Sequence, residues 1–348
     1  MAPFKERILF LPGIFSKERG EEVKIFANGF HDYCTEKDLE ISRTTLEEDD
    51  LSIIRFKVKN HHGQEKFYDF TEIYWGDLMS NLNDLSPVAK LFQGMSLCIY
   101  WITRKGLWKK GYKNKWVNLQ LITATLTILG WYLTTLLGIL STVDWTSIQL
   151  PYGTPDSLEA LALEFQNRIA ALWILLTALI QFFPLTLVAD AFHKMRCYFQ
   201  NRNSCSRKVR ARTLAAIYKA RNIGNYDKIT IAAHCFGSIP AIEAMAHLEG
   251  ETKNIRLLSL GSLVWLMRGW SDNVQDTLKT IKDRYTPSQW LYYYSTKDWL
   301  CSSHTPQEFS EAITCCEIKN TTSLLEKMNF VSHQLYFTDW DVMDEILG

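Results

Sequence analysis

The chain has 348 residues, of which 38 are basic and 38 acidic, so its formal net charge is zero. Hydrophobic residues make up 47% and aromatic residues 13%, which argues against a disordered chain. The mean hydropathy of −0.12 argues against a polytopic transporter, and the lack of a basic excess argues against a general nucleic-acid-binding protein. The length allows one large domain or two smaller ones.

The N-terminal part begins with strand-like and helix-like segments. An apolar run at 7–11 precedes Pro12-Gly13-Ile14-Phe15 and predicts a buried strand that ends in a turn. Residues 18–33 then predict a helix, and β-rich runs at 51–58 and 66–74 predict two strands. The apolar run is too short for the core of a secretion signal, so we predict no cleaved signal peptide.

The middle of the chain contains two long segments almost without charge, 116–143 and 169–190. Each reaches the roughly 20 residues that a helix needs to cross a bilayer, so they predict two transmembrane helices. The alternative is a pair of long buried helices in a soluble core. A shorter apolar stretch, 91–102, predicts an amphipathic helix at the membrane interface, with a simple core helix as its alternative.

Basic residues flank the two apolar segments. Six precede the first segment and seven follow the second: Arg104, Lys105, Lys109, Lys110, Lys113, Lys115, then Lys194, Arg196, Arg202, Arg207, Lys208, Arg210 and Arg212. The connecting loop, 144–168, carries one basic residue and four acidic ones. The positive-inside rule therefore places both termini in the cytoplasm, and we expect the lipid bilayer to be a partner.

The C-terminal part alternates strands and helices. Strands are predicted at 228–233, 255–260, 289–295 and 313–318, and helices at 211–220 and 241–248. This order favours an α/β fold with a mostly parallel sheet. A tight turn joins the first of these strands to the second helix, with the sequence Ala233-His234-Cys235-Phe236-Gly237-Ser238.

This turn resembles the nucleophile elbow of the α/β-hydrolase superfamily, whose pattern is G-x-S-x-G. Ala233 takes the place of the first glycine and Cys235 that of the serine, while Gly237 matches the last glycine. The resemblance implies Cys235 as the nucleophile, and the N-terminus of the following helix favours a thiolate. The alternative is a buried, inert thiol.

The superfamily's order of nucleophile, acid and histidine implies two further catalytic residues. Asp298 follows the strand at 289–295, where the acid is expected, and His333 follows in the last part of the chain. His333 would take the proton of the nucleophile and Asp298 would orient its imidazole. Other candidates for these two roles are Asp272, Asp283 and His304.

The same resemblance implies an oxyanion hole. The amide of Phe236 would be one donor, and the amide of Ile14 or Phe15, in the loop after the first strand, would be the other. His234, inside the elbow, is interpreted as a residue that packs the turn. None of the eight cysteines belongs to a C-x-x-C pair or a zinc-type spacing, and no nucleotide-binding glycine motif occurs. We therefore predict reduced thiols, no cofactor and no metal.

These features divide the chain into three parts. Residues 1–90 and 213–348 are expected to form an α/β-hydrolase-like domain, with the catalytic residues in the second part. Residues 91–212 are expected to form an inserted membrane module with a two-helix transmembrane hairpin. The favoured function is a membrane-anchored hydrolase or acyltransferase that acts on an ester or thioester of an amphiphilic substrate. The alternatives are an inert hydrolase-like sensor or interaction protein, and an effector that perturbs membranes.

Overall fold

The computed structural model describes most of the N-terminal and C-terminal parts of the chain. The described residues are 3–16, 18–48, 51–79, 185–223, 225–250, 252–268, 271–298, 307–319 and 333–348, with short stretches between 86 and 100, between 126 and 138, and at 170–177. The chain divides into two compact units. The first comprises 1–80, 108–114 and 194–348, and the second comprises 81–107 and 115–193.

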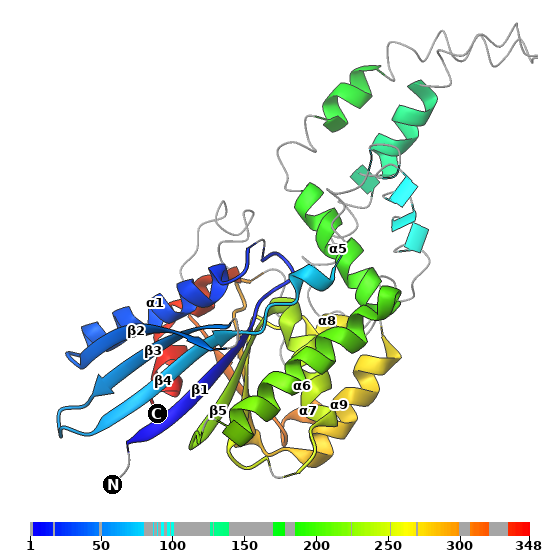
Figure 1. Cartoon of the computed structure of the whole chain (residues 1–348). Helices are drawn as coiled ribbons and strands as arrows, with labels where there is room; N and C mark the ends of the chain where they lie inside the picture. Colours follow the sequence, from blue (N-terminus) through cyan, green and yellow to red (C-terminus); the bar gives the residue numbers. More distant parts are fainter. Residues whose placement is uncertain are drawn as a thin grey trace, which may run out of the picture. The chain divides into compact units, whose positions relative to one another are not determined.

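The first unit is built on one mixed, mostly parallel sheet (Figure 1). Its eight described strands are β1 (Phe4–Leu11), β2 (Glu40–Glu48), β3 (Leu51–Lys59), β4 (Glu65–Glu72), β5 (Lys228–His234), β6 (Ile255–Leu260), β7 (Trp290–Tyr294) and β8 (Thr314–Glu317). They lie in the order β2-β3-β4-β1-β5-β6-β7-β8. The β2–β3 and β3–β4 pairs are antiparallel, and every neighbouring pair from β4 to β8 is parallel. The predicted α/β class with a mostly parallel sheet is confirmed.

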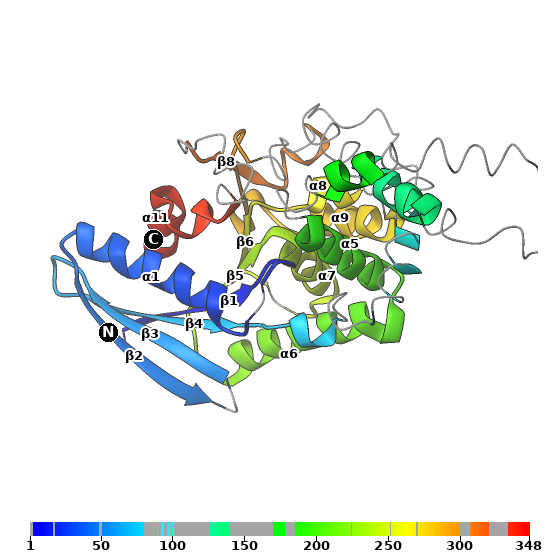
Figure 2. The ribbon, with the colours of Figure 1, turned by 90° about the horizontal axis from the view of Figure 1, so that it is seen from above.

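Helices cover both faces of this sheet. Helices α1 (Glu21–Glu36) and α11 (Trp340–Leu347) lie on one face, and α6 (Cys205–Ile223), α7 (Ser238–His247) and α9 (Asp272–Arg284) lie on the other (Figure 2). Because successive side chains of a strand point to opposite faces, β1 sends Ile8 and Phe10 into the aromatic core under α1. Arg7 and Leu9 therefore face α6. Two further helices are α5 (Leu185–Phe199) and the short α8 (Val264–Arg268).

Most differences from the predicted elements concern exposed or short segments. Strand β2 was not predicted, because it is an exposed edge strand whose sequence, Glu40-Ile-Ser-Arg-Thr-Thr-Leu-Glu-Glu48, has no apolar run. Helix α6 begins at Cys205 rather than at 211, so the predicted domain boundary at 212 falls inside it. Helices α9 and α11 were also missed, although α9 buries Val274, Leu278 and Ile281 at helical spacing.

In the second unit, parts of the predicted apolar segments are helical. Residues 129–138 and 170–177 are helical, and so are the described residues of the predicted interfacial helix at 91–102. The remaining residues of the predicted spans 116–143 and 169–190 lie largely outside the described part of the chain. None of the described helices combines the length and the apolar character needed to cross a membrane.

Two reciprocal hydrogen bonds join the helical stretches of the second unit. The indole of Trp131 donates to the Thr177 hydroxyl at 3.1 Å, and the indole of Trp173 donates to the Thr135 hydroxyl at 3.0 Å. The bonds join residue 131 to 177 and residue 135 to 173, so the numbers rise along one stretch while they fall along the other. The two stretches therefore run antiparallel. The outward surface of this pair carries exposed apolar side chains: Leu126, Leu129, Leu133, Leu136, Leu137, Leu172, Ile174 and Leu175.

Candidate functional site

The loops after β1, β5, β6 and β7 meet at the carboxyl edge of the sheet, because parallel strands all end on the same side. Strand β5 ends at His234, and α7 begins only four residues later, at Ser238. Cys235 makes this sharp reversal with a φ of 54°, in the left-handed region that side chains other than glycine rarely adopt. A strained residue at this position is a sign of an imposed geometry rather than of local preference.

Hydrogen bonds to the Cys235 carbonyl hold the strained turn. The Ser238 hydroxyl donates to it at 2.5 Å, and the Leu263 amide donates to it at 3.3 Å from the loop after β6. The Ser262 hydroxyl lies 2.5 Å from the Ser238 hydroxyl and accepts from the Val264 amide. The turn is therefore tied to the neighbouring loop as well as to its own helix.

The loop after β1 lies directly against the turn. A Cβ built on Gly237 would lie 2.5 Å from the Pro12 carbonyl oxygen, and one built on Gly13 would lie 3.1 Å from the Cys235 Cβ. Only glycine allows the two backbones to approach this closely at Gly237. The approach brings the loop with Ile14, which is buried, and Phe15, which is half-buried, beside the turn that contains Phe236.

Aromatic packing fixes the side chain of Phe236. Its ring lies 5.3 to 5.9 Å from the rings of Trp75, Tyr198 and Phe199. The indole of Trp75 also donates to the Pro12 carbonyl at 3.1 Å. The aromatic cluster thus connects the two segments from which the sequence predicts oxyanion donors.

The structure brings Asp298 and His333 together. The Nδ1 of His333 lies 2.8 Å from the Oδ2 of Asp298, and both side chains are buried. The Tyr336 hydroxyl donates to the same carboxylate oxygen at 2.9 Å and accepts from the Ser295 amide. Asp298 therefore receives two hydrogen bonds that fix its orientation relative to the imidazole.

His234 links this pair to the turn. Its Nε2 donates to the backbone carbonyl of His333 at 2.8 Å, and the two imidazole centroids are 4.7 Å apart. Its Nδ1 lies 3.1 Å from the Oε2 of Glu22, which also accepts from the Gly13 amide at 3.0 Å. His234 thus packs the turn and also connects helix α1 with the loop that carries His333.

Glu22 is a buried acid beside His234 that no sequence motif singles out. Burial raises the pKa of its carboxyl. The hydrogen bond and charge of His234, together with the hydrogen bond from the Gly13 amide, lower the pKa by more, so the net shift is downward. The carboxylate is therefore ionised at neutral pH and faces His234. The available sequence signal was an acid in the first turn of the helix that follows the first strand.

The other predicted residues contribute less to this arrangement. Asp272 begins α9 and Asp283 lies near its end, and both are exposed, whereas His304 lies outside the described residues. Cys235, His333 and Asp298 expose 0%, 2% and 1% of their surfaces, so the site is closed to solvent in this structure. Within the described residues, no group of three His, Cys, Asp or Glu side chains is placed to hold a metal ion.

The arrangement places the imidazole of His333, oriented by Asp298, at the same edge of the sheet as the strained turn that carries the Cys235 thiol. A thiol and an oriented imidazole are groups used in nucleophilic acyl transfer. Comparison with known proteins gave no match, whether to a protein-family model, to a curated protein or to a solved structure.

Proposed function

We propose that the chain is an α/β-hydrolase-like enzyme that cleaves or transfers an acyl group from an ester or thioester. The observation that carries the proposal is the buried hydrogen bond between His333 and Asp298, at the same edge of the sheet as the strained Cys235 turn. The chain order of Cys235, Asp298 and His333 is also that of the superfamily. The strand, sharp turn and helix around Cys235 agree with a nucleophile elbow.

In the proposed reaction, the Cys235 sulfur attacks the acyl carbonyl while the Nε2 of His333 takes the thiol proton. The tetrahedral intermediate collapses by breaking the bond to the leaving alcohol or thiol, which receives that proton from His333. Water then attacks the acyl-cysteine, and His333 again transfers the proton, so that the acid is released and the thiol restored. Asp298 keeps the His333 Nδ1 protonated throughout, and the amides of Phe236 and of Ile14 or Phe15 stabilise the oxyanion.

The second unit supports a membrane-proximal substrate. Its indole and hydroxyl groups bond to each other between the two helical stretches, while leucine and isoleucine side chains are exposed on the outside. Polar groups that bond to each other across a helical pair, together with exposed apolar side chains, suit a bilayer environment. We propose that 116–143 and 169–190 form a transmembrane hairpin, which keeps both termini and the site in the cytoplasm and favours an amphiphilic acyl substrate.

A second candidate is an inert hydrolase-like sensor or interaction protein at the membrane. The specific observation in its favour is the burial of Cys235, which exposes none of its surface. A buried thiol packed among neighbours behaves as a small apolar residue, so its position in the core needs no catalytic role. In the enzyme, by contrast, substrate entry requires the site to open.

The test is hydrolysis of a short-chain acyl thioester by the purified full-length protein. We expect turnover that is lost in Cys235→Ala and in His333→Ala. Cys205→Ala is the matched control, because Cys205 is another buried thiol and lies outside the site. Equal turnover in the wild type and in Cys235→Ala would contradict the proposal, and no turnover with any acyl thioester or activated ester would favour the inert protein.

Membrane attachment needs its own test, because the enzyme could be active without the hairpin. We expect the full-length protein to remain in the membrane fraction after alkaline extraction. Extraction into the soluble fraction would contradict the transmembrane hairpin while leaving the acyl-transfer proposal in place. Leakage of dye from protein-loaded liposomes would instead favour the membrane-perturbing alternative.

A further inference from the structure

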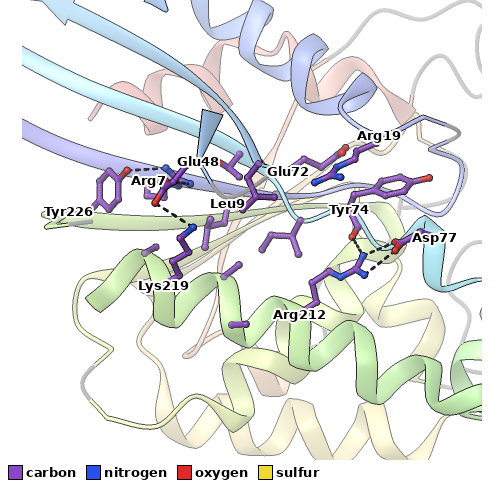
Figure 3. Close-up of a pocket in the computed structure, with 16 residues that line it drawn as sticks. Arg7, Leu9, Arg19, Glu48, Glu72, Tyr74, Asp77, Arg212, Lys219 and Tyr226 are labelled. Atoms are coloured by element: carbon purple, nitrogen blue, oxygen red, sulfur yellow. Dashed lines mark hydrogen bonds and ion pairs between the residues drawn. The ribbon is translucent and has the colours of Figure 1, made fainter. Parts of the chain in front are cut away.

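A cavity of about 590 Å³ lies in the first unit between strands β1 and β4 and helix α6 (Figure 3). Its volume falls within the roughly 300–1,000 Å³ typical of small-molecule sites. Leu9, Ile73, Ala215 and Ala216 supply apolar parts of its lining, and Tyr74 and Tyr226 supply aromatic parts. Neither Cys235, Asp298 nor His333 lines it, so the cavity is separate from the candidate site.

Three buried polar atoms of this lining have no hydrogen-bond partner in the structure: the Arg7 Nε, the Thr71 Oγ1 and the Glu72 Oε1. The three side chains are 4%, 2% and 6% exposed, so bulk water does not readily satisfy them. Leaving a buried donor or acceptor unsatisfied costs about 1–3 kcal/mol. Three such atoms around one cavity therefore indicate a polar molecule that completes their hydrogen bonds.

The charged groups of the lining are largely paired with one another. At one end, Glu48 lies 3.7 Å from Arg7 and 3.4 Å from Lys219, and Arg7 donates to the Tyr226 hydroxyl. At the other end, Arg212 makes a two-bond contact with Asp77 (Figure 3). These pairings reduce the attraction for a strongly charged ligand of either sign.

Glu72 lines the cavity at the end of β4. Its Oε2 accepts from the Gly20 amide at 2.5 Å, and its Oε1 is the buried oxygen without a hydrogen-bond partner. Burial is the main cause that raises its pKa to about 7, with a further contribution from the charge of Glu22, while the Gly20 hydrogen bond opposes the rise. Near neutral pH the carboxyl can thus accept a hydrogen bond or donate one.

We propose that this cavity binds an uncharged small molecule rich in hydroxyl groups, of the sugar type. A hydroxyl can accept from the Arg7 Nε and donate to the Glu72 Oε1, and the Thr71 hydroxyl can bond either way. The apolar and aromatic parts of the lining suit the C–H faces of a sugar ring. The inference does not depend on the proposed acyl transfer, because it uses no residue of the candidate site.

The experiment is a calorimetric titration of the full-length protein with glucose, galactose, N-acetylglucosamine and maltose. We expect saturable binding of at least one of them, weakened about tenfold or more by Thr71→Val and by Glu72→Gln. Thr71→Val is nearly isosteric and removes an unsatisfied hydroxyl, so the unliganded variant should be at least as stable as the wild type. Glu72→Gln can still accept from the Gly20 amide.

Thr277→Val is the matched control. The Thr277 hydroxyl bonds within α9, away from the cavity, so its loss should leave sugar affinity unchanged. The proposal is overturned if none of the four sugars binds, or if Thr71→Val and Glu72→Gln bind them as tightly as the wild type. Binding of inorganic phosphate or spermidine in their place, sensitive to the same two substitutions, would overturn the neutral ligand class.

Discussion

The Nδ1 of His333 lies 2.8 Å from the Oδ2 of Asp298, although the two residues are 35 positions apart in the chain. This hydrogen bond fixes the proton on Nδ1 and leaves Nε2 as the atom through which His333 can exchange a proton. In the proposed enzyme, Asp298→Asn should allow the wrong tautomer and lower kcat about 10⁴-fold with little change in KM. Thioester hydrolysis under saturating conditions measures this loss.

Tyr336→Phe is the companion to that substitution. It removes one of the hydrogen bonds to the Asp298 carboxylate, together with the bond from the Ser295 amide to the tyrosine hydroxyl, but keeps the bond to His333. We therefore expect a loss of about tenfold, in line with a single hydrogen bond. A larger effect of Tyr336→Phe than of Asp298→Asn would show that Asp298 does not orient the imidazole.

The left-handed backbone of Cys235 makes a prediction about stability that is independent of catalysis. Cys235→Gly and Cys235→Ala both remove the thiol, but only glycine adopts a φ of 54° without steric cost. Cys235→Gly should therefore be more stable than Cys235→Ala by about 1 kcal/mol. Urea unfolding of both variants measures the difference. Equal stabilities, or a more stable alanine variant, would contradict the strained turn.

Glu22 should make the fold sensitive to acid. Its pKa in the folded chain is below the ordinary value of 4.5, so its ionised form stabilises the fold above that pH, and the contribution disappears as the pH falls through the folded pKa. Glu22→Gln should lose about 1–3 kcal/mol of unfolding free energy at pH 7, and the difference should shrink in acid. Glu21→Gln, an exposed neighbour, is the control and should show no comparable change. A constant difference across the pH range would contradict this account.

Glu72 should make the fold less stable as the pH rises, the opposite of the effect of Glu22. Its pKa rises from 4.5 to about 7 on folding, so the folded state holds the proton more tightly and stability decreases as the pH rises from 4.5 through 7. Glu72→Gln removes this loss, and the variant should exceed the wild type by about 2–3 kcal/mol above pH 7. The gap should close near pH 4.5 in urea unfolding curves. A variant less stable than the wild type at pH 8 would show that the carboxylate is needed in its ionised form.

The sequence alone was sufficient for the parallel part of the sheet and for the turn at Cys235. Buried parallel strands are short continuous apolar runs, as in 228–233 and 255–260, and such runs are visible without any tertiary context. The exposed strand β2 has no such run, since its pairing with β3 depends on the backbone rather than on buried side chains. Helix α9 differs from β2, because its apolar residues Val274, Leu278 and Ile281 recur at helical spacing and this signal is present in the sequence.

The position of Asp298 after a strand and the order of the three candidate residues could likewise be read from the chain. Their hydrogen bonds could not, because Asp298, His333 and Tyr336 meet only when β7 and the C-terminal segment pack together. Glu22 could not be selected either, because an acid in the first turn of a helix is ordinary until the fold buries it beside His234. The same holds for the cavity: Arg7, Thr71 and Glu72 are ordinary charged and polar residues of two strands. Only the packing of α6 and of the segment at Gly20 against the sheet buries these side chains at a common cavity. The sequence thus determined what is periodic or local, whereas burial and long-range hydrogen bonding, which depend on all the surrounding segments at once, were decided by the tertiary structure.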